Sequence, residues 1–191
     1  MRVEVRFSGF GGQGIVTAGI ILARAASIHD GKQAVQTQSY GPEARGGASR
    51  SEVVISDEEI LYPKVLRPDI FVVMSGEAMQ KYLRDLKKGG VVIYDSSLIK
   101  TPPAKGSAYP VPATLLAKRE VGKPIVANII LLGALTAITG VVSREAMEKA
   151  VLESVPKGTE EMNRKALHIG FAEGEKLVRA QPRSRCLSPG S

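Results

Sequence analysis

The sequence is poor in cysteine, histidine and aromatic residues. Its 191 residues include one cysteine, two histidines and no tryptophan. The single thiol, Cys186, excludes a disulfide within the chain, and it excludes a zinc or iron–sulfur site built from several of its cysteines. His29 and His168 stand apart from Cys186 and from each other, so the sequence pairs no nucleophile with a base. We therefore expect no catalytic residue and no metal ligand in this chain.

The chain also lacks a long apolar run and a leader-like start. Its longest apolar stretch covers residues 125–138, which is shorter than the ~20 residues of a membrane-spanning helix. Residues 1–5 alternate charged residues with valine, unlike a secretory signal peptide. The formal net charge is +7, but the basic residues are scattered and are not interleaved with aromatic ones. We expect a cytoplasmic protein that binds neither membranes nor nucleic acid.

Apolar patterning predicts that strands alternate with helices in the first half of the chain. Residues 69–74 and 91–95 have the continuous apolar runs typical of buried parallel strands. Shorter or alternating runs predict further strands at 3–7, 32–39, 51–56 and 107–111. Ala18, Ile21, Leu22 and Ala25 share one face of a helix between the first two strands. This order predicts an α/β fold with three layers, α/β/α.

The second half of the chain is predicted to be helical. Residues 125–139 are apolar on nearly every face, which predicts a helix buried inside the domain or at a subunit contact. Ser143 and Thr159 stand where they could cap the next two helices. We expect residues 1–180 to form a single domain. Residues 181–191 show no periodicity and are expected to form a flexible tail.

A glycine-rich loop follows the first predicted strand. Gly9, Gly11 and Gly14 match the pattern G-x-G-x-x-G directly before a helix, where backbone N–H groups can receive an anion. A dinucleotide-binding unit would also need an acid at the end of the second strand, and residues 35–38 contain none. The missing acid disfavours dinucleotide binding, which stays open beside two alternatives: a turn needed only for packing and a contact with a ligand or partner. We take Gly11, Gly12, Gln13 and Gly14 as candidate binding residues.

Two further sites combine polar residues with glycine or apolar surroundings. In the segment 39–49, Arg45 stands beside Gly46 and Gly47, which could present a fixed cation and free amides to a carboxylate or phosphate. The alternative is a surface loop in which Arg45 pairs with Glu43 or Glu52.

Asn128 lies within the apolar helix, where its amide must find a partner. It either holds a neighbouring loop or faces a ligand.

Taken together, these motifs resemble one protein family. The glycine loop at 9–14, the segment 40–47, Tyr62-Pro63, residues 111–114 and Ala127-Asn128 are similar to the gamma subunits of 2-oxoacid:ferredoxin oxidoreductases. The block 36–51 most resembles the 2-oxoglutarate branch of these enzymes. The resemblance covers about residues 3–175 and is far more specific than the glycine loop alone.

The resemblance implies a reaction and a fold. A 2-oxoacid, coenzyme A and oxidised ferredoxin yield an acyl-CoA, carbon dioxide and reduced ferredoxin. The complex is expected to use thiamine diphosphate, Mg²⁺, iron–sulfur clusters and coenzyme A. With one cysteine and no Gly-Asp-Gly…Asn pattern, this chain is expected to bind none of these cofactors alone. The fold is expected to resemble the gamma domain of pyruvate:ferredoxin oxidoreductase.

The resemblance also implies partners. Alpha and beta subunits are expected, a delta subunit is an optional addition, and ferredoxin is met through the complex. The chain is then part of an oxidoreductase and is not active alone. Two other functions stay open from the residues themselves. One is a stand-alone dinucleotide-binding oxidoreductase, and the other is a scaffold module of a different complex.

Overall fold

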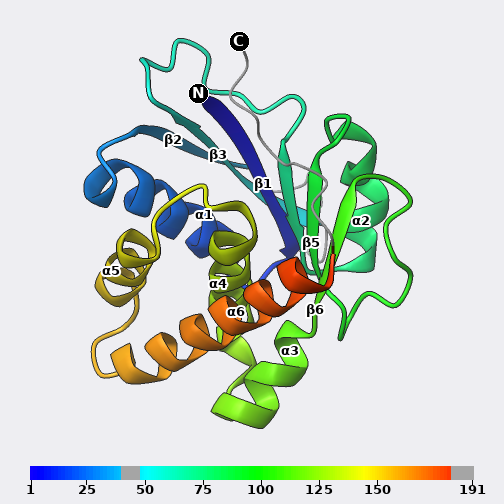
Figure 1. Cartoon of the computed structure of the whole chain (residues 1–191), viewed down its shortest axis with the longest axis vertical. Helices are drawn as coiled ribbons and strands as arrows, with labels where there is room; N and C mark the ends of the chain where they lie inside the picture. The colour runs from blue at the N-terminus through cyan, green and yellow to red at the C-terminus, as the bar shows by residue number, and fades with distance from the viewer. Residues whose placement is uncertain (40–47, 182–191) are drawn as a thin grey trace.

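The computed structural model describes residues 1–39 and 48–181, and within these ranges the strands form one six-stranded sheet (Figure 1). Along the sheet the strand order is β2-β3-β1-β4-β5-β6. The strands are β1 (Arg2–Phe10), β2 (Gln33–Ser39), β3 (Ala48–Ser56), β4 (Ile70–Val73), β5 (Val91–Asp95) and β6 (Ser107–Val111). The bounds of β5 and β6 agree with the sequence prediction. Strands β1 and β3 extend beyond it.

The directions of the strands separate this sheet from a simple dinucleotide-binding unit. Strands β1, β4, β5 and β6 are parallel, whereas β3 runs antiparallel to both β1 and β2. Strand β3 therefore lies between β1 and β2. In a dinucleotide-binding strand–helix–strand unit the first two strands are neighbours. The end of β2, where a ribose-binding acid would be expected, is therefore separated from β1 by β3.

Helices cover both faces of the sheet, which confirms the three-layer α/β/α prediction. In Figure 1, α1, α4, α5 and α6 lie on one side of the sheet and α2 lies on the other. The α-helices are α1 (Ile15–Arg24), α2 (Gly76–Tyr82), α3 (Ala113–Leu116), α4 (Ala127–Thr139), α5 (Arg144–Ser154) and α6 (Glu160–Ala180). Short π or 3₁₀ segments adjoin them: η1 (Ala25–His29), η2 (Leu83–Asp85), η3 (Ala117–Val121) and η4 (Pro124–Val126).

Two apolar cores follow from the alternation of side chains along the strands. Val5 of β1 and Val72 of β4 belong to the larger core, under α1 and α4. Phe71 and Val73 of β4 point to the opposite face and belong to the smaller core with Tyr82. Successive strand residues face opposite sides of a sheet, so one short strand serves both cores.

Close backbone contact joins α4 and α6. A Cβ atom added at Gly170 would overlap the carbonyl oxygen of Ile130 and lie 2.9 Å from Cα of Gly133. An atom added at Gly133 would likewise overlap the carbonyl oxygen of Leu167. The two helices therefore approach each other through glycine, at a separation that larger side chains would prevent.

The helix caps and the buried helix differ in part from expectation. Ser143 caps α5 as predicted, since its hydroxyl accepts a hydrogen bond from the N–H of Ala146 at 3.1 Å. Thr159 precedes α6, but the prediction that it caps the helix was wrong. Its backbone is not extended, and its hydroxyl donates to the carbonyl of Pro156 at 2.6 Å. Ile125 is 70% exposed because it lies in η4, ahead of the buried helix.

The chain shows no helix in residues 1–39 and 48–181 that is long and apolar enough to cross a membrane.

Helix α6 ends at Ala180, and Gln181 donates a hydrogen bond to the carbonyl of Ala108 at 2.7 Å. The tail expected at 181–191 lies almost wholly outside the described residues. The boundary between a domain at 1–180 and this tail stays a prediction.

Candidate functional site at the glycine loop

The glycine loop connects the carboxyl end of β1 to the first turn of α1. Gly11 and Gly12 are exposed at its tip, and Gly12 has a φ of +85°. Gly14 immediately precedes α1 with a φ of +75°, a conformation that favours glycine. No acidic residue stands in the first turn of α1, and no side chain caps it. The first N–H groups of this helix therefore lack a side-chain acceptor, as an anion site requires.

Gln13 fixes the shape of the loop with both ends of its amide. Its Oε1 accepts a hydrogen bond from the backbone N–H of Phe10 at 2.7 Å. Its Nε2 donates to the carbonyl of Met74, just after β4, at 3.1 Å. Gln13 thus ties the turn after β1 to the turn after β4. Its role as a binding residue stays a prediction, and in this structure its amide positions the loop.

Asn128 fixes the other side of the loop. Its Nδ2 donates to the carbonyl of Gly14 at 3.2 Å, and its Oδ1 accepts from the N–H of Ile129 at 2.9 Å. A Cβ atom at Gly14 would overlap this amide. Of the two alternatives for Asn128, holding a neighbouring loop is the one with direct contacts. A contact between Asn128 and a ligand stays a prediction.

Two hollows flank the tip of the loop and share Gly12 and Ile125 as lining residues. The first, which we call the helical hollow, has a volume of about 300 Å³ and lies between the loop and the end of α5. The second, which we call the strand-end hollow, has a volume of about 350 Å³ and reaches Met74 and Thr114 at the ends of β4 and β6. The described residues that line the two hollows include no lysine or arginine.

The helical hollow contains polar residues that sequence reasoning missed. Ser154 of α5 lines it, and the Ser154 hydroxyl is buried without a hydrogen-bond partner among the described residues. Thr17 and Asn163 line the same hollow from α1 and α6. These residues lie far apart in the sequence and carry no local motif. Only the packing of α5 against α1, and of α6 against α4 and α5, brings them to the glycine loop.

The strand-end hollow has a rigid wall next to β5 and β6. Asp95, the last residue of β5, is fully buried. Its Oδ2 accepts hydrogen bonds from the N–H and the hydroxyl of Thr114, at 3.1 and 2.5 Å. Its Oδ1 accepts from the N–H of Ser97 at 3.0 Å. Asp95 therefore positions Thr114 at the hollow, a role that its place in an apolar strand did not suggest.

The described residues that flank the second predicted loop lie at the strand ends near the glycine loop. Ala48, the first residue of β3, pairs with Phe10 at the end of β1, and Ser39 at the end of β2 pairs with Arg50. Arg45, Gly46 and Gly47 themselves lie outside the described residues, so their anion-binding role stays a prediction. Glu52, one suggested partner for Arg45, forms an ion pair with Arg6 at 2.7 Å.

A metal site needs several ligating side chains close together. In residues 1–39 and 48–181, no three or more histidine, cysteine, aspartate and glutamate side chains gather where they could hold a metal ion. Cys186, the one cysteine of the sequence, lies outside those ranges. A four-cysteine cluster cannot be built from this chain by itself.

Comparisons with known proteins agree with these features. A family model described as pyruvate ferredoxin/flavodoxin oxidoreductase matches residues 4–173. The 2-oxoglutarate synthase subunit KorC of Methanocaldococcus jannaschii is 58% identical over 180 residues, which cover 93% of this chain and 96% of that protein.

Solved structures show the same likeness. The gamma subunit of a keto/oxoacid ferredoxin oxidoreductase from Geobacter sulfurreducens has a TM-score of 0.86 and 50% identity, covering 93% of this chain and 98% of that one. The 2-oxoglutarate:ferredoxin oxidoreductase of Magnetococcus marinus, with 2-oxoglutarate, coenzyme A and succinyl-CoA bound, has a TM-score of 0.81 and 25% identity. That match covers 95% of this chain and 32% of the longer one. The chain therefore belongs to the pyruvate ferredoxin/flavodoxin oxidoreductase family, as a gamma subunit of the 2-oxoglutarate type.

Proposed function

We propose that this gamma subunit supports the CoA-dependent oxidative decarboxylation of 2-oxoglutarate, and that its glycine loop binds part of coenzyme A. The products are succinyl-CoA, carbon dioxide and reduced ferredoxin. Thiamine diphosphate, Mg²⁺ and the iron–sulfur clusters belong to alpha and beta partners, and in some complexes to a delta partner. This chain contributes a shaped surface and hydrogen-bonding groups.

The observation that carries the proposal concerns Gly11. Gly9 and Gly14 are required by the chain itself, because a Cβ atom at either would overlap a side-chain amide. Gly12 has a positive φ. Gly11 has neither feature, since its φ is not positive and a Cβ atom there would meet nothing within 4 Å. Its lack of a side chain leaves open space at the loop tip, which a ligand approaching the backbone can use.

The surroundings fit an elongated ligand with an anionic end. The uncapped first turn of α1 offers N–H groups to a phosphate. The helical hollow offers apolar walls and the unpaired hydroxyl of Ser154 to a neutral, hydrogen-bonding arm. Coenzyme A has both parts, a phosphate-rich end and an amide-containing arm. Arg45 is proposed to supply the cation that the described lining lacks.

The proposal can be tested in the assembled complex by following the reduction of a viologen dye that depends on 2-oxoglutarate and coenzyme A. Leaving out this chain should abolish the rate. We expect Gly11→Ala and Gly12→Ala to raise the apparent KM for coenzyme A about fivefold or more, which corresponds to about 1 kcal/mol of lost binding. Arg45→Ala should raise the KM of an anionic substrate in the same assay.

Gly31→Ala is the matched control for Gly12→Ala. Gly31 also has a positive φ, of +67°, and also has open space around it, but it lies beyond the opposite end of α1. It should carry the same backbone strain without affecting coenzyme A. If Gly31→Ala raised the KM as much as Gly12→Ala, or if Gly11→Ala and Arg45→Ala left it unchanged, the loop would have a structural role only. An unchanged rate without the chain would refute the function itself.

A further inference from the structure

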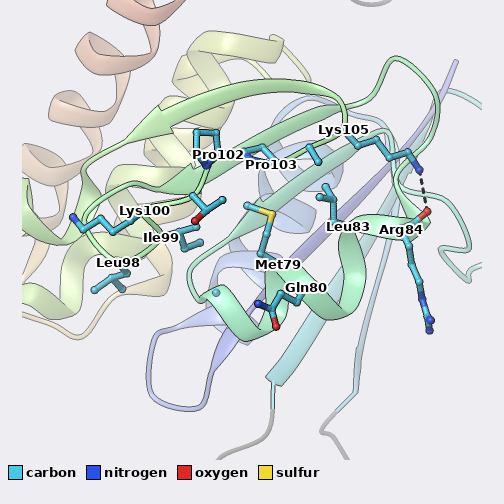
Figure 2. A pocket seen from close by; sticks show the side chains of 13 residues that line it. Met79, Gln80, Leu83, Arg84, Leu98, Ile99, Lys100, Pro102, Pro103 and Lys105 are labelled. Carbon is cyan, nitrogen blue, oxygen red and sulfur yellow. Dashed lines mark hydrogen bonds between the residues drawn. The ribbon is translucent and has the colours of Figure 1, made fainter.

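An apolar groove lies on the α2 side of the molecule, away from the glycine loop tip. Its volume is about 480 Å³, larger than either hollow at the loop. Figure 2 shows Met79 and Leu83 of the α2 region facing Ile99 and the prolines of the segment 98–105. Its lining is mostly apolar but includes Arg84, Lys100 and Lys105, and Leu98 is 47% exposed. We call this feature the apolar groove.

A second hollow adjoins the groove and is rich in positive charge. Its volume is about 460 Å³, and it shares Arg84 and Lys105 with the apolar groove. The cations that line it are Arg67, Arg84, Lys87, Lys88 and Lys105. The one acidic residue in its lining, Asp85, already pairs with the buried Arg6 at 2.7 Å. We call this feature the cationic hollow.

The charges of the cationic hollow are largely uncompensated. Lys87 pairs with Asp69 at 2.8 Å. Arg67 and Lys88 form no ion pair with any residue in 1–39 or 48–181. The Arg84 side chain is 84% exposed, and its nearest carboxylate contact, with Asp85, is 3.8 Å long. Like charges that gather without counter-charges favour an acidic partner.

The two features are built on fixed backbone. Lys105 donates from Nζ to the carbonyl of Arg84 at 2.9 Å, which links the segment 98–105 to η2 (Figure 2). The N–H of Lys87 donates to the carbonyl of Pro68 at 3.0 Å, and the N–H of Ile99 donates to the carbonyl of Asp95 at 2.9 Å. A surface that is already ordered loses little conformational entropy when a partner binds.

We propose that the apolar groove and the cationic hollow together bind an acidic segment of another subunit of the oxidoreductase complex. The segment places an apolar side chain in the groove and carboxylates over the hollow. The identity of the partner rests on the proposed function of the chain. A small anion would leave the groove unused, and an apolar ligand would leave the cations unused. A second copy of this chain would bring like charges together at the shared surface, which is unfavourable.

The test uses the complex reconstituted from purified subunits, with the full-length chain. We expect Lys88→Glu/Lys105→Glu to weaken binding of this chain to the other subunits about tenfold or more, with a loss that shrinks at high salt. Ala104→Trp, at an exposed position that lines the groove, should weaken binding by filling it. Lys165→Glu/Lys176→Glu on α6 is the matched control, with the same change in net charge at two exposed positions. Circular dichroism confirms that each variant is folded.

Carbodiimide cross-linking of the wild-type complex identifies the occupant. Amide bonds from Lys88 or Lys105 to aspartate or glutamate of another subunit support the proposal. Cross-links only to ferredoxin or only to a second copy of this chain overturn it, and so does equal weakening by both charge-reversal pairs. Turnover of 2-oxoglutarate is measured separately. An active complex without these cross-links refutes the docking surface alone, whereas cross-links in a complex inactive on 2-oxoacids refute the proposed function alone.

Discussion

Replacing Arg6 by methionine should be among the most destabilising single changes in this protein. Arg6 stands in β1 and is 2% exposed, with its guanidinium inside the α2 side of the sheet. It donates to Glu52 on the neighbouring strand β3 and to Asp85 in η2, both at 2.7 Å, and to the carbonyl of Val65 at 3.3 Å. One side chain thus joins two strands, a helix end and a loop.

The expected loss of unfolding free energy depends on the carboxylates that Arg6→Met leaves without their partner. Methionine fills most of the space of the arginine stem, so packing is largely kept. The Glu52 side chain is only 10% exposed and would keep only Arg50, at the longer distance of 3.9 Å, while Asp85, at 32%, remains partly in contact with water. Removing one partner of a buried ion pair costs about 3–5 kcal/mol, because the other charge stays buried without compensation. Arg6→Met should lower the free energy of unfolding by about that amount.

Urea unfolding followed by circular dichroism measures this loss. The variant Arg6→Met/Glu52→Leu replaces both charges with apolar groups, and it should recover at least about 2 kcal/mol relative to Arg6→Met. Arg6→Lys keeps the charge but not the fork of donors, so it should fall between the wild type and Arg6→Met. A stability of Arg6→Met within about 1 kcal/mol of the wild type would contradict a structural role for the buried ion pair. A double variant no more stable than Arg6→Met would contradict it as well.

Two further predictions concern the α4–α6 contact and pH. Gly170→Ala should lower the free energy of unfolding by about 2 kcal/mol, because about 3 kcal/mol of backbone overlap outweighs about 1 kcal/mol of helix propensity. Gly76→Ala in α2, where a Cβ atom meets nothing within 4 Å, should be nearly neutral in the same melt, and equal effects would contradict the contact. Burial raises the pKa of Tyr94 above its ordinary value of 10.0. Its contribution to stability is therefore complete below about pH 10 and is lost as the pH rises through the raised pKa. Tyr94→Phe should show a smaller fall in unfolding free energy above about pH 10 than the wild type, and parallel curves would argue against this cause.

The apolar patterns predicted the elements of this fold well, but they did not predict the pairing of its strands. The runs at 91–95 and 107–111 became β5 and β6 without change. A buried run indicates a strand and not its neighbour, so the place of β3 between β1 and β2 was not predicted. Its antiparallel direction follows from the short connection 40–47, because parallel neighbours need a longer crossover.

The candidate site was predicted only where its residues are close together in the sequence. The glycine loop was predicted because Gly9, Gly11 and Gly14 are close together in the sequence. The contact of Gln13 with Met74 depends on β4 lying beside β1, which no local motif encodes. Ser154 was missed as a lining residue for the same reason, since it reaches the loop through the packing of α5 against α1.

The cationic hollow and the glycine loop lie at opposite ends of the strands of one sheet, which allows both to be occupied at once. The cationic hollow is built from residues that precede β4, β5 and β6, at the amino ends of these strands. The glycine loop and the strand-end hollow follow β1, β4 and β6, at the carboxyl ends. Leu98 is the point of contact between them, because it lines both the apolar groove and the strand-end hollow. A segment seated in the groove would contact Leu98, which lines the strand-end hollow beside the glycine loop, so docking of the partner and binding at the loop should be coupled. Such coupling is reciprocal, because each binding event changes the free energy of the other by the same amount.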